Sequence, residues 1–136
     1  MKADLKNDFL YPELSNKIIG CAFSVFNSVG AGHLEKVYQK SLAVALKQAE
    51  LGFKEEVTCS VFYGGMKVGT GRADFLVEDK ILVELKRGHT FNPGDFNQLK
   101  SYLASMKLEL GLMFRFTSEG VIHKRVVHMQ TIEKIA

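Results

Sequence analysis

The chain has 136 residues, of which 46% are hydrophobic and 24% are charged, and its formal net charge is +3. A chain of this length is expected to form one domain, residues 1–136, with a sizeable core. The composition is that of a soluble globular protein, and no apolar run has the length of a membrane span. Cys21 and Cys59 are isolated and the first residues lack the apolar segment of a secretory signal, so we expect a cytoplasmic protein. The slight excess of positive charge permits nucleic-acid binding without indicating it.

Two helices are predicted in the first part of the chain, after a loosely held tail at residues 1–10. Pro12 is typical of the first turn of a helix, and apolar residues recur at helical spacing from there to Gly30. A second helix is expected from about Leu34 to Leu51, where a glycine follows. Glu35 heads the apolar stripe of this helix. Taken alone, this position favours a structural role, because an acid in the first turn meets the positive end of the helix dipole.

Five strands and one more helix are predicted in the rest of the chain. The first strand, Val57–Tyr63, alternates apolar and polar side chains, and Gly64-Gly65 would turn it into the next strand. Gly69 and Gly71 indicate a bulge or a close approach of another backbone. The other predicted elements are two central strands at Thr70–Val77 and Ile81–Lys86, a helix from Pro93 or Asp95 to about Met106, a strand at Leu108–Phe116 buried on both faces, and a last strand at Val121–Met129. The order is helix, helix, three strands, helix, two strands, which predicts an α/β fold with a mixed sheet.

The central pair of strands carries charged side chains on an otherwise hydrophobic hairpin. If residues 78–80 form a three-residue loop, Val77 pairs with Ile81 and Asp74 lies opposite Glu84, with Lys86 on the same face as Glu84. Directly opposed like charges are unfavourable, and a divalent cation between them would relieve the repulsion. The alternative is a solvated strand face with weak cross-strand ion pairs. The residues alone favour the two interpretations about equally, because the motif is short.

Two motifs connect this hairpin to a known family. Asp74, followed by Glu84-Leu85-Lys86, resembles the D…(D/E)xK signature of the PD-(D/E)XK nuclease superfamily. The segment from Gly32 to Tyr38 also fits GxxExxY, the motif that names a small family within that superfamily. The resemblance runs in order from about Leu14 to Val127. One departure is Ala73, which stands where the superfamily has a proline.

The resemblance implies a fold and a metal site. The fold would be the restriction-endonuclease-like αβββαβ core, with one helix added before it and one strand after it. Asp74 and Glu84 would be the ligands of Mg²⁺, for which Mn²⁺ can substitute, and the backbone carbonyl of Leu85 would add a third ligand. Glu35 would complete the acidic cluster, directly or through a metal-bound water. A small number of carboxylates with several retained waters is what Mg²⁺ prefers.

The resemblance also implies an activity, the hydrolysis of phosphodiester bonds in DNA. Lys86 would orient or help deprotonate the attacking water and stabilise the charge that develops at the phosphate. Gln98, on the third predicted helix, would stand at the edge of the site and position Lys86 or a phosphate. The acids and the lysine that the motif requires are all present.

Two other classes of function stay open at this point. The chain could be a non-catalytic module that keeps the fold and binds nucleic acid or a protein. It could also be a structural protein whose acids pair internally, in which case it would not bind Mg²⁺ or Mn²⁺ specifically. A homodimer that spans a duplex is a further expectation, by analogy with nucleases of this fold. The glycines form neither GxGxxG nor a P-loop, so no nucleotide cofactor is expected, and no membrane partner is expected either.

Overall fold

The computed structural model describes residues 10–88 and 90–129. In these residues the chain forms three helices and five strands in the predicted order. The predicted tail at residues 1–10 lies almost wholly outside the described residues. The elements are α2 (Pro12–Val29), α3 (Glu35–Gln48), β1 (Phe53–Tyr63), β2 (Met66–Val77), β3 (Ile81–Lys86), α4 (Pro93–Met106), β4 (Leu110–Phe116) and β5 (Val121–Val127). The α/β fold expected from the sequence is confirmed.

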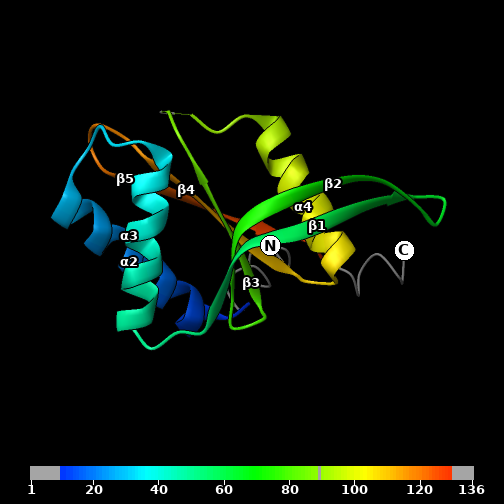
Figure 1. Ribbon diagram of the computed structural model, residues 1–136, viewed down its shortest axis with the longest axis horizontal. Helices are drawn as coiled ribbons and strands as arrows, with labels where there is room; N and C mark the ends of the chain where they lie inside the picture. The colour runs from blue at the N-terminus through cyan, green and yellow to red at the C-terminus, as the bar shows by residue number, and fades with distance from the viewer. Residues whose placement is uncertain (1–9, 89, 130–136) are drawn as a thin grey trace, which may run out of the picture.

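The strands form one mixed sheet in the order β1-β2-β3-β4-β5. The pair β3 and β4 is parallel and the other three pairs are antiparallel. A parallel pair needs a crossover connection, and α4 provides it. Figure 1 shows α2 and α3 together on one side of the sheet and α4 on the other side. The carboxyl end of β3 therefore lies where both helical layers can reach it.

Each helical layer buries its own part of the core. The larger part joins α2 and α3 to the sheet, with Ile18, Leu42 and Leu46 fully buried. The smaller part lies under α4, through Leu99 and Leu103. All seven residues of β4 are buried, which agrees with the prediction from its unbroken apolar run. No helix in the described ranges is long and apolar enough to cross a membrane.

The first hairpin is longer than predicted. β1 begins at Phe53 rather than Val57, and β2 begins at Met66 rather than Thr70. The added residues are mostly exposed, because β1 is an edge strand and the tip of the hairpin extends beyond α4 (Figure 1). A strand exposed on both faces loses the alternation of apolar and polar residues by which a strand is predicted.

The second helix is shorter than predicted. It ends at Gln48 rather than Leu51. The amide of Leu51 donates to the carbonyl of Leu46, and Glu50 takes the left-handed conformation with φ 60°. This is the hydrogen-bond pattern of a Schellman ending, with a glutamate at the position that glycine usually takes.

The predictions made from the glycines agree with the structure. Gly64 and Gly65 both have positive φ, as the two-residue turn requires. The register between β1 and β2 shifts beside Phe62, which is the predicted bulge. A Cβ on Gly71 would lie 1.9 Å from the hydroxyl oxygen of Tyr102, so the absence of a side chain lets α4 pack against this strand.

Candidate active site

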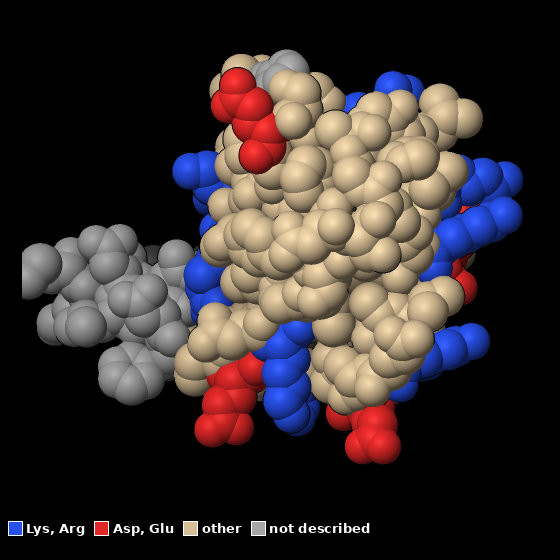
Figure 2. Space-filling model, turned by 90° about the vertical axis from the view of Figure 1, so that its left-hand side faces the viewer, with Lys and Arg blue, Asp and Glu red and all other residues tan. Residues whose placement is uncertain are grey.

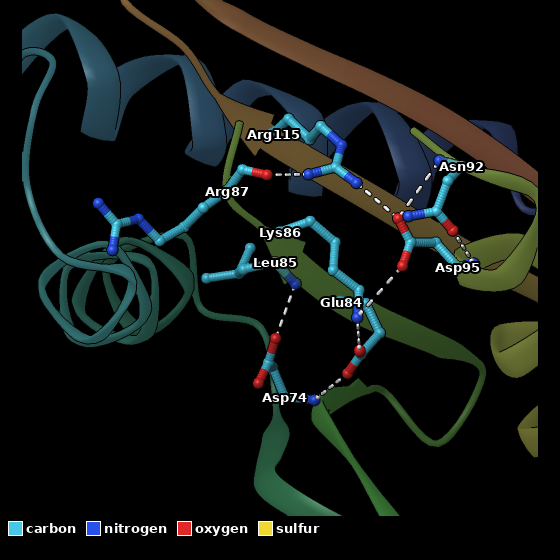
Figure 3. A network of polar contacts seen from close by, with 8 residues as sticks. All are labelled: Asp74, Glu84, Leu85, Lys86, Arg87, Asn92, Asp95 and Arg115. Atoms are coloured by element: carbon cyan, nitrogen blue, oxygen red, sulfur yellow. Dashed lines mark hydrogen bonds and ion pairs between the residues drawn. The ribbon is translucent and has the colours of Figure 1, made fainter. Parts of the chain in front are cut away.

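The β2–β3 ladder ends just before the two predicted carboxylates. Val77 pairs with Ile81, as predicted, and the pairing extends as far as Phe75 and Val83. Beyond that point side chains take the place of backbone pairing (Figure 3). The amide of Asp74 donates to Oε1 of Glu84 at 2.9 Å, and the amide of Leu85 donates to Oδ2 of Asp74 at 2.7 Å. The strands thus separate, and each holds the carboxylate of the other.

Burial, together with repulsion from nearby carboxylates, disfavours the charged form of three carboxyl groups here. Burial first, and the nearby charge of Asp74 second, raise the pKa of Glu84 to about 7. Burial also raises the pKa of Asp74. Glu35 has a raised pKa through burial and then through the charge of Asp74. For all three groups the charge of Lys86 lowers the pKa and so partly opposes these effects. The cluster is short of positive charge, which a divalent cation would supply.

Lys86 stands at the end of β3 between two carboxylates. Its Nζ lies 3.7 Å from Oε2 of Glu84 and 3.8 Å from Oδ1 of Asp95. The side chain is 25% exposed, so the ammonium is accessible from outside but fixed from both sides. The structure therefore places the lysine of the motif beside its glutamate, as the sequence predicted.

A second polar layer behind Lys86 was not found from the sequence. Asp95 Oδ2 accepts a hydrogen bond from Nη2 of Arg115 at 2.5 Å, and Nη1 of the same guanidinium donates to the carbonyl of Arg87. Asp95 also forms a capping box with Asn92 at the start of α4. Arg115 is only 5% exposed. Two features of the sequence could have indicated this layer. One is the Asn-x-x-Asp spacing at the start of a helix, and the other is a cation inside the apolar run of β4.

The GxxExxY segment forms the opposite wall of the site. Glu35 is the first residue of α3, is half-buried, and lines the same cavity as Lys86. The Tyr38 hydroxyl donates to the carbonyl of Gly30 at 2.8 Å and accepts from the amide of His33 at 3.4 Å. The tyrosine thus holds in place the loop that leads into α3 and its first residue, Glu35. Its ring also stacks on Phe116, with the ring centroids 4.2 Å apart.

A cavity of about 320 Å³ lies between this wall and the end of β3. Glu35 and Tyr38 line it on one side, and Lys86, Arg87 and Thr117 line it on the other. It is open to the outside, and three of the predicted site residues line it, namely Glu35, Leu85 and Lys86. A ligand that enters it would meet one carboxylate and two cations.

Gln98 does not join the network around Lys86. It is exposed on α4. Asp95, one turn earlier on the same helix, makes the contact with Lys86 instead. The predicted role of Gln98 toward Lys86 or a phosphate therefore stays a prediction, as do the roles assigned to the other site residues.

The donor set fits a hard divalent cation that keeps several waters. Asp74 and Glu84 each use one carboxylate oxygen for a backbone amide, which leaves Oδ1 of Asp74 and Oε2 of Glu84. Within the described part of the chain, no three His, Cys, Asp or Glu side chains gather as a complete metal cage. Two carboxylates with retained waters are nevertheless the usual protein contribution to a Mg²⁺ site. The contact seen for Leu85 is made by its amide, so the role of its carbonyl stays a prediction.

Comparison with protein families gives one match over most of the chain. The family model described as "PD-(D/E)XK nuclease superfamily" matches residues 12–128. This range includes Glu35, the central hairpin and α4. No curated protein sequence matches the chain.

Solved structures with a similar fold include SSO0001 and the alkaline exonuclease LHK-Exo from Laribacter hongkongensis. SSO0001 has 18% identity and a TM-score of 0.55, with 96% of this chain covered and 64% of that one. LHK-Exo has 11% identity and a TM-score of 0.53, with 86% and 72% covered. Its complex with dAMP has 10% identity and a TM-score of 0.54, with 89% and 72% covered. At such identities the likeness shows the fold alone, and this chain spans less than two thirds of the length of SSO0001.

Proposed function

Because the chain belongs to the PD-(D/E)XK nuclease superfamily, we propose that it is a divalent-metal-dependent nuclease that hydrolyses phosphodiester bonds of DNA. We assign it to the GxxExxY group, on the segment from Gly32 to Tyr38. The observation that carries the proposal is a pair of hydrogen bonds between the strands: the Glu84 carboxylate accepts from the amide of Asp74, and the Asp74 carboxylate accepts from the amide of Leu85. Lys86 lies directly beside Glu84. The similarity of its fold to that of an alkaline exonuclease also supports the proposal.

The metal would be held by Asp74 and Glu84, with the carbonyl of Leu85 as a third ligand. Glu35 would reach it directly or through water. Mg²⁺, or Mn²⁺ in its place, supplies neutralisation of the phosphate charge and a more acidic water when bound. The pKa of Glu84, raised to about 7 by burial and by Asp74, fits this role because a cation would favour the ionised form.

The protein's own groups would position the reactants. The ammonium of Lys86 would hold the attacking water and stabilise the charge that develops on the phosphate oxygens. Asp95 contacts Lys86 and is itself held by Arg115, so these two residues would fix the lysine in place. Gln98 would contact a phosphate from the exposed face of α4. We further propose that the protein acts in the cytoplasm and that a homodimer spans a duplex.

The test compares wild type with Asp74→Asn, which keeps the shape of the side chain and an acceptor for the amide of Leu85. Asp79→Asn is the matched control, because Asp79 is an exposed acid in the turn of the same hairpin. Each protein is titrated with Mg²⁺ and Mn²⁺ and incubated with labelled single-stranded, duplex and branched DNA, and with RNA. We expect metal-dependent cleavage by wild type and Asp79→Asn, and a loss of roughly a thousandfold or more in Asp74→Asn, because metal ligation is removed.

The other outcomes distinguish the remaining functions. Metal binding without cleavage of any substrate would favour a non-catalytic module that keeps the fold. Absence of specific metal binding in wild type, measured by calorimetry, would overturn the metal site and assign the acids a structural role. Cleavage that persists in Asp74→Asn would place the chemistry elsewhere.

A further inference from the structure

The outer face of the first hairpin carries a row of polar, cationic and aromatic side chains. Strand pairing sets Thr58 opposite Arg72, Ser60 opposite Thr70, and Phe62 opposite Lys67. Cross-strand partners point to the same face, and alternate residues of one strand share it. These six residues, which we call the outer row, therefore lie on one face of the hairpin and end two residues before Asp74.

The opposite face of the hairpin is occupied by protein. Cys59 and Ala73 are fully buried in the core under α4, and Val57 and Val61 pack against that core. The outer row points away from these residues. Its members are exposed, except for Ser60, which is half-buried. The row is thus accessible to solvent in the part of the chain that the structure describes, and it begins beside the proposed active site.

The bulge in β2 determines which residue completes the row. Val61 pairs with Gly69, but Phe62 pairs with Lys67, so Val68 is the extra residue. Without the bulge, Val68 would lie opposite Phe62, and the side chain of Lys67 would point to the other face of the hairpin. A bulge often re-aims a side chain in this way. Here it sets a cation beside an exposed aromatic ring.

The charge of the hairpin has one sign over its outer part. No Asp or Glu occurs between Val57 and Ala73, whereas Lys67 and Arg72 are both cations. Arg72 forms an ion pair with Glu56 at 3.7 Å, but both side chains are about two thirds exposed, so the pair contributes little and a stronger anion can displace it. The hydroxyls of Thr58, Ser60 and Thr70 add hydrogen-bond donors of the kind that contact phosphates.

The end of the hairpin adds exposed apolar surface. Phe62 is 57% exposed and Tyr63 is 81% exposed, and Met66 and Val68 are also largely exposed. By contrast, Figure 2 shows a face at the α2 and α3 end of the molecule whose centre is uncharged, with Lys, Arg, Asp and Glu at its edge. A polyanion therefore has a better partner in the hairpin than on that face.

We infer that the outer row binds the sugar–phosphate backbone of the nucleic-acid substrate next to the cleavage site, with Phe62 stacking on a base. From Thr58 to Phe62 the row extends about 13 Å at roughly 3.3 Å per residue. This is about four nucleotide steps of roughly 3.4 Å along one strand. The inference rests on the proposed function and adds to it the surface that holds the substrate.

The test measures binding separately from cleavage. Fluorescence anisotropy with a labelled 20-base-pair DNA duplex, and with one of its strands, is recorded without divalent metal over a range of salt. We expect Lys67→Gln to lower the affinity about threefold near 0.1 M salt and to reduce the salt slope by about one, because one phosphate contact is lost. Phe62→Ser should weaken binding roughly tenfold with an unchanged slope, because stacking does not release counterions.

Two variants on α2 and α3 are matched controls. Lys17→Gln removes an exposed cation and Val44→Ser removes an exposed apolar side chain, both away from the hairpin. Both should bind like wild type. Equal binding by all four variants would overturn the inference even if wild type cleaves DNA. Weaker binding by the hairpin variants, in a protein that cleaves no tested substrate, would support the outer row as a nucleic-acid-binding surface and favour the non-catalytic module over the nuclease.

Two further outcomes would also overturn the inference. If the wild-type protein binds neither the duplex nor the single strand, the outer row does not bind DNA. A smaller sedimentation coefficient for Phe62→Ser, with DNA affinity unchanged, would assign the exposed end of the hairpin to a second copy of this chain. If the hairpin variants lose affinity for single-stranded DNA but not for the duplex, the outer row binds a single strand.

Discussion

The ammonium of Lys86 lies between two carboxylates that differ in their other partners. Glu84 also binds the amide of Asp74, whereas Asp95 binds the guanidinium of Arg115. Arg115 is in turn held by the carbonyl of Arg87 and stacks over Phe91. A metal ion at Glu84 would compete with Lys86 for that carboxylate. Asp95 would then be the group that keeps the lysine in place.

Substitution of Asp95 by Asn tests this positioning role. The change keeps the size of the side chain and its acceptor oxygen for the helix cap, but it removes the charge that attracts Lys86 and pairs with Arg115. We expect kcat to fall about tenfold, equivalent to about 1.4 kcal/mol. KM and the affinity for Mn²⁺ should change little, because neither the substrate nor the metal is proposed to contact Asp95. Steady-state kinetics and calorimetry measure these quantities.

Asn92→Ala is the control for the helix cap. Asn92 forms the other half of the capping box and does not contact Lys86 through its side chain. Its loss should lower the stability of the protein by about 1 kcal/mol and leave kcat near the wild-type value. Equal losses of kcat in the two variants would show that the cap, and not the charge of Asp95, is what matters.

At the level of elements, the sequence was most informative where partners are close along the chain. The hairpin register follows from one short loop, so the neighbourhood of Asp74, Glu84 and Lys86 could be predicted. The separation of the strands could not, because it depends on side chains that take the place of backbone partners. Asp95 and Arg115 lie 20 residues apart on different elements, and only the crossover through α4 brings them together.

The packing of α4 against β2 depends on one position without a side chain. A Cβ on Gly71 would lie 1.9 Å from the hydroxyl oxygen of Tyr102 and 2.6 Å from its Cζ. Gly71→Ala should therefore move α4 or the hairpin and lower the free energy of unfolding by roughly 1 to 3 kcal/mol, as overpacking does. Gly69→Ala, whose Cβ would have its nearest neighbour at 4.0 Å, is the control and should be close to neutral. Urea denaturation measures both, and equal stabilities would contradict the tight contact.

For the whole molecule, the acidic cluster links stability to pH. The pKa of Glu84 is about 7 in the folded protein, raised from 4.5 chiefly by burial and then by Asp74. Between these pH values the folded state therefore binds more protons than the unfolded state. Stability must then fall as pH rises from about 4.5 to about 7. A tenfold difference in proton affinity between the folded and unfolded states corresponds to about 1.4 kcal/mol, so Glu84 alone accounts for up to roughly 3 kcal/mol. The raised pKa of Asp74 acts in the same direction.

Urea denaturation at pH 5 and pH 8 without divalent metal tests this linkage. Wild type should be less stable at pH 8, and Glu84→Gln should lose much of the difference, because it stays neutral at both values. Glu119→Gln, in the exposed turn between β4 and β5, is the control and should follow wild type. Added Mn²⁺ should stabilise wild type more at pH 8 than at pH 5, because its ligands bind as carboxylates. The same pH dependence in wild type and Glu84→Gln would show that this buried carboxyl is not the group that links folding to proton binding.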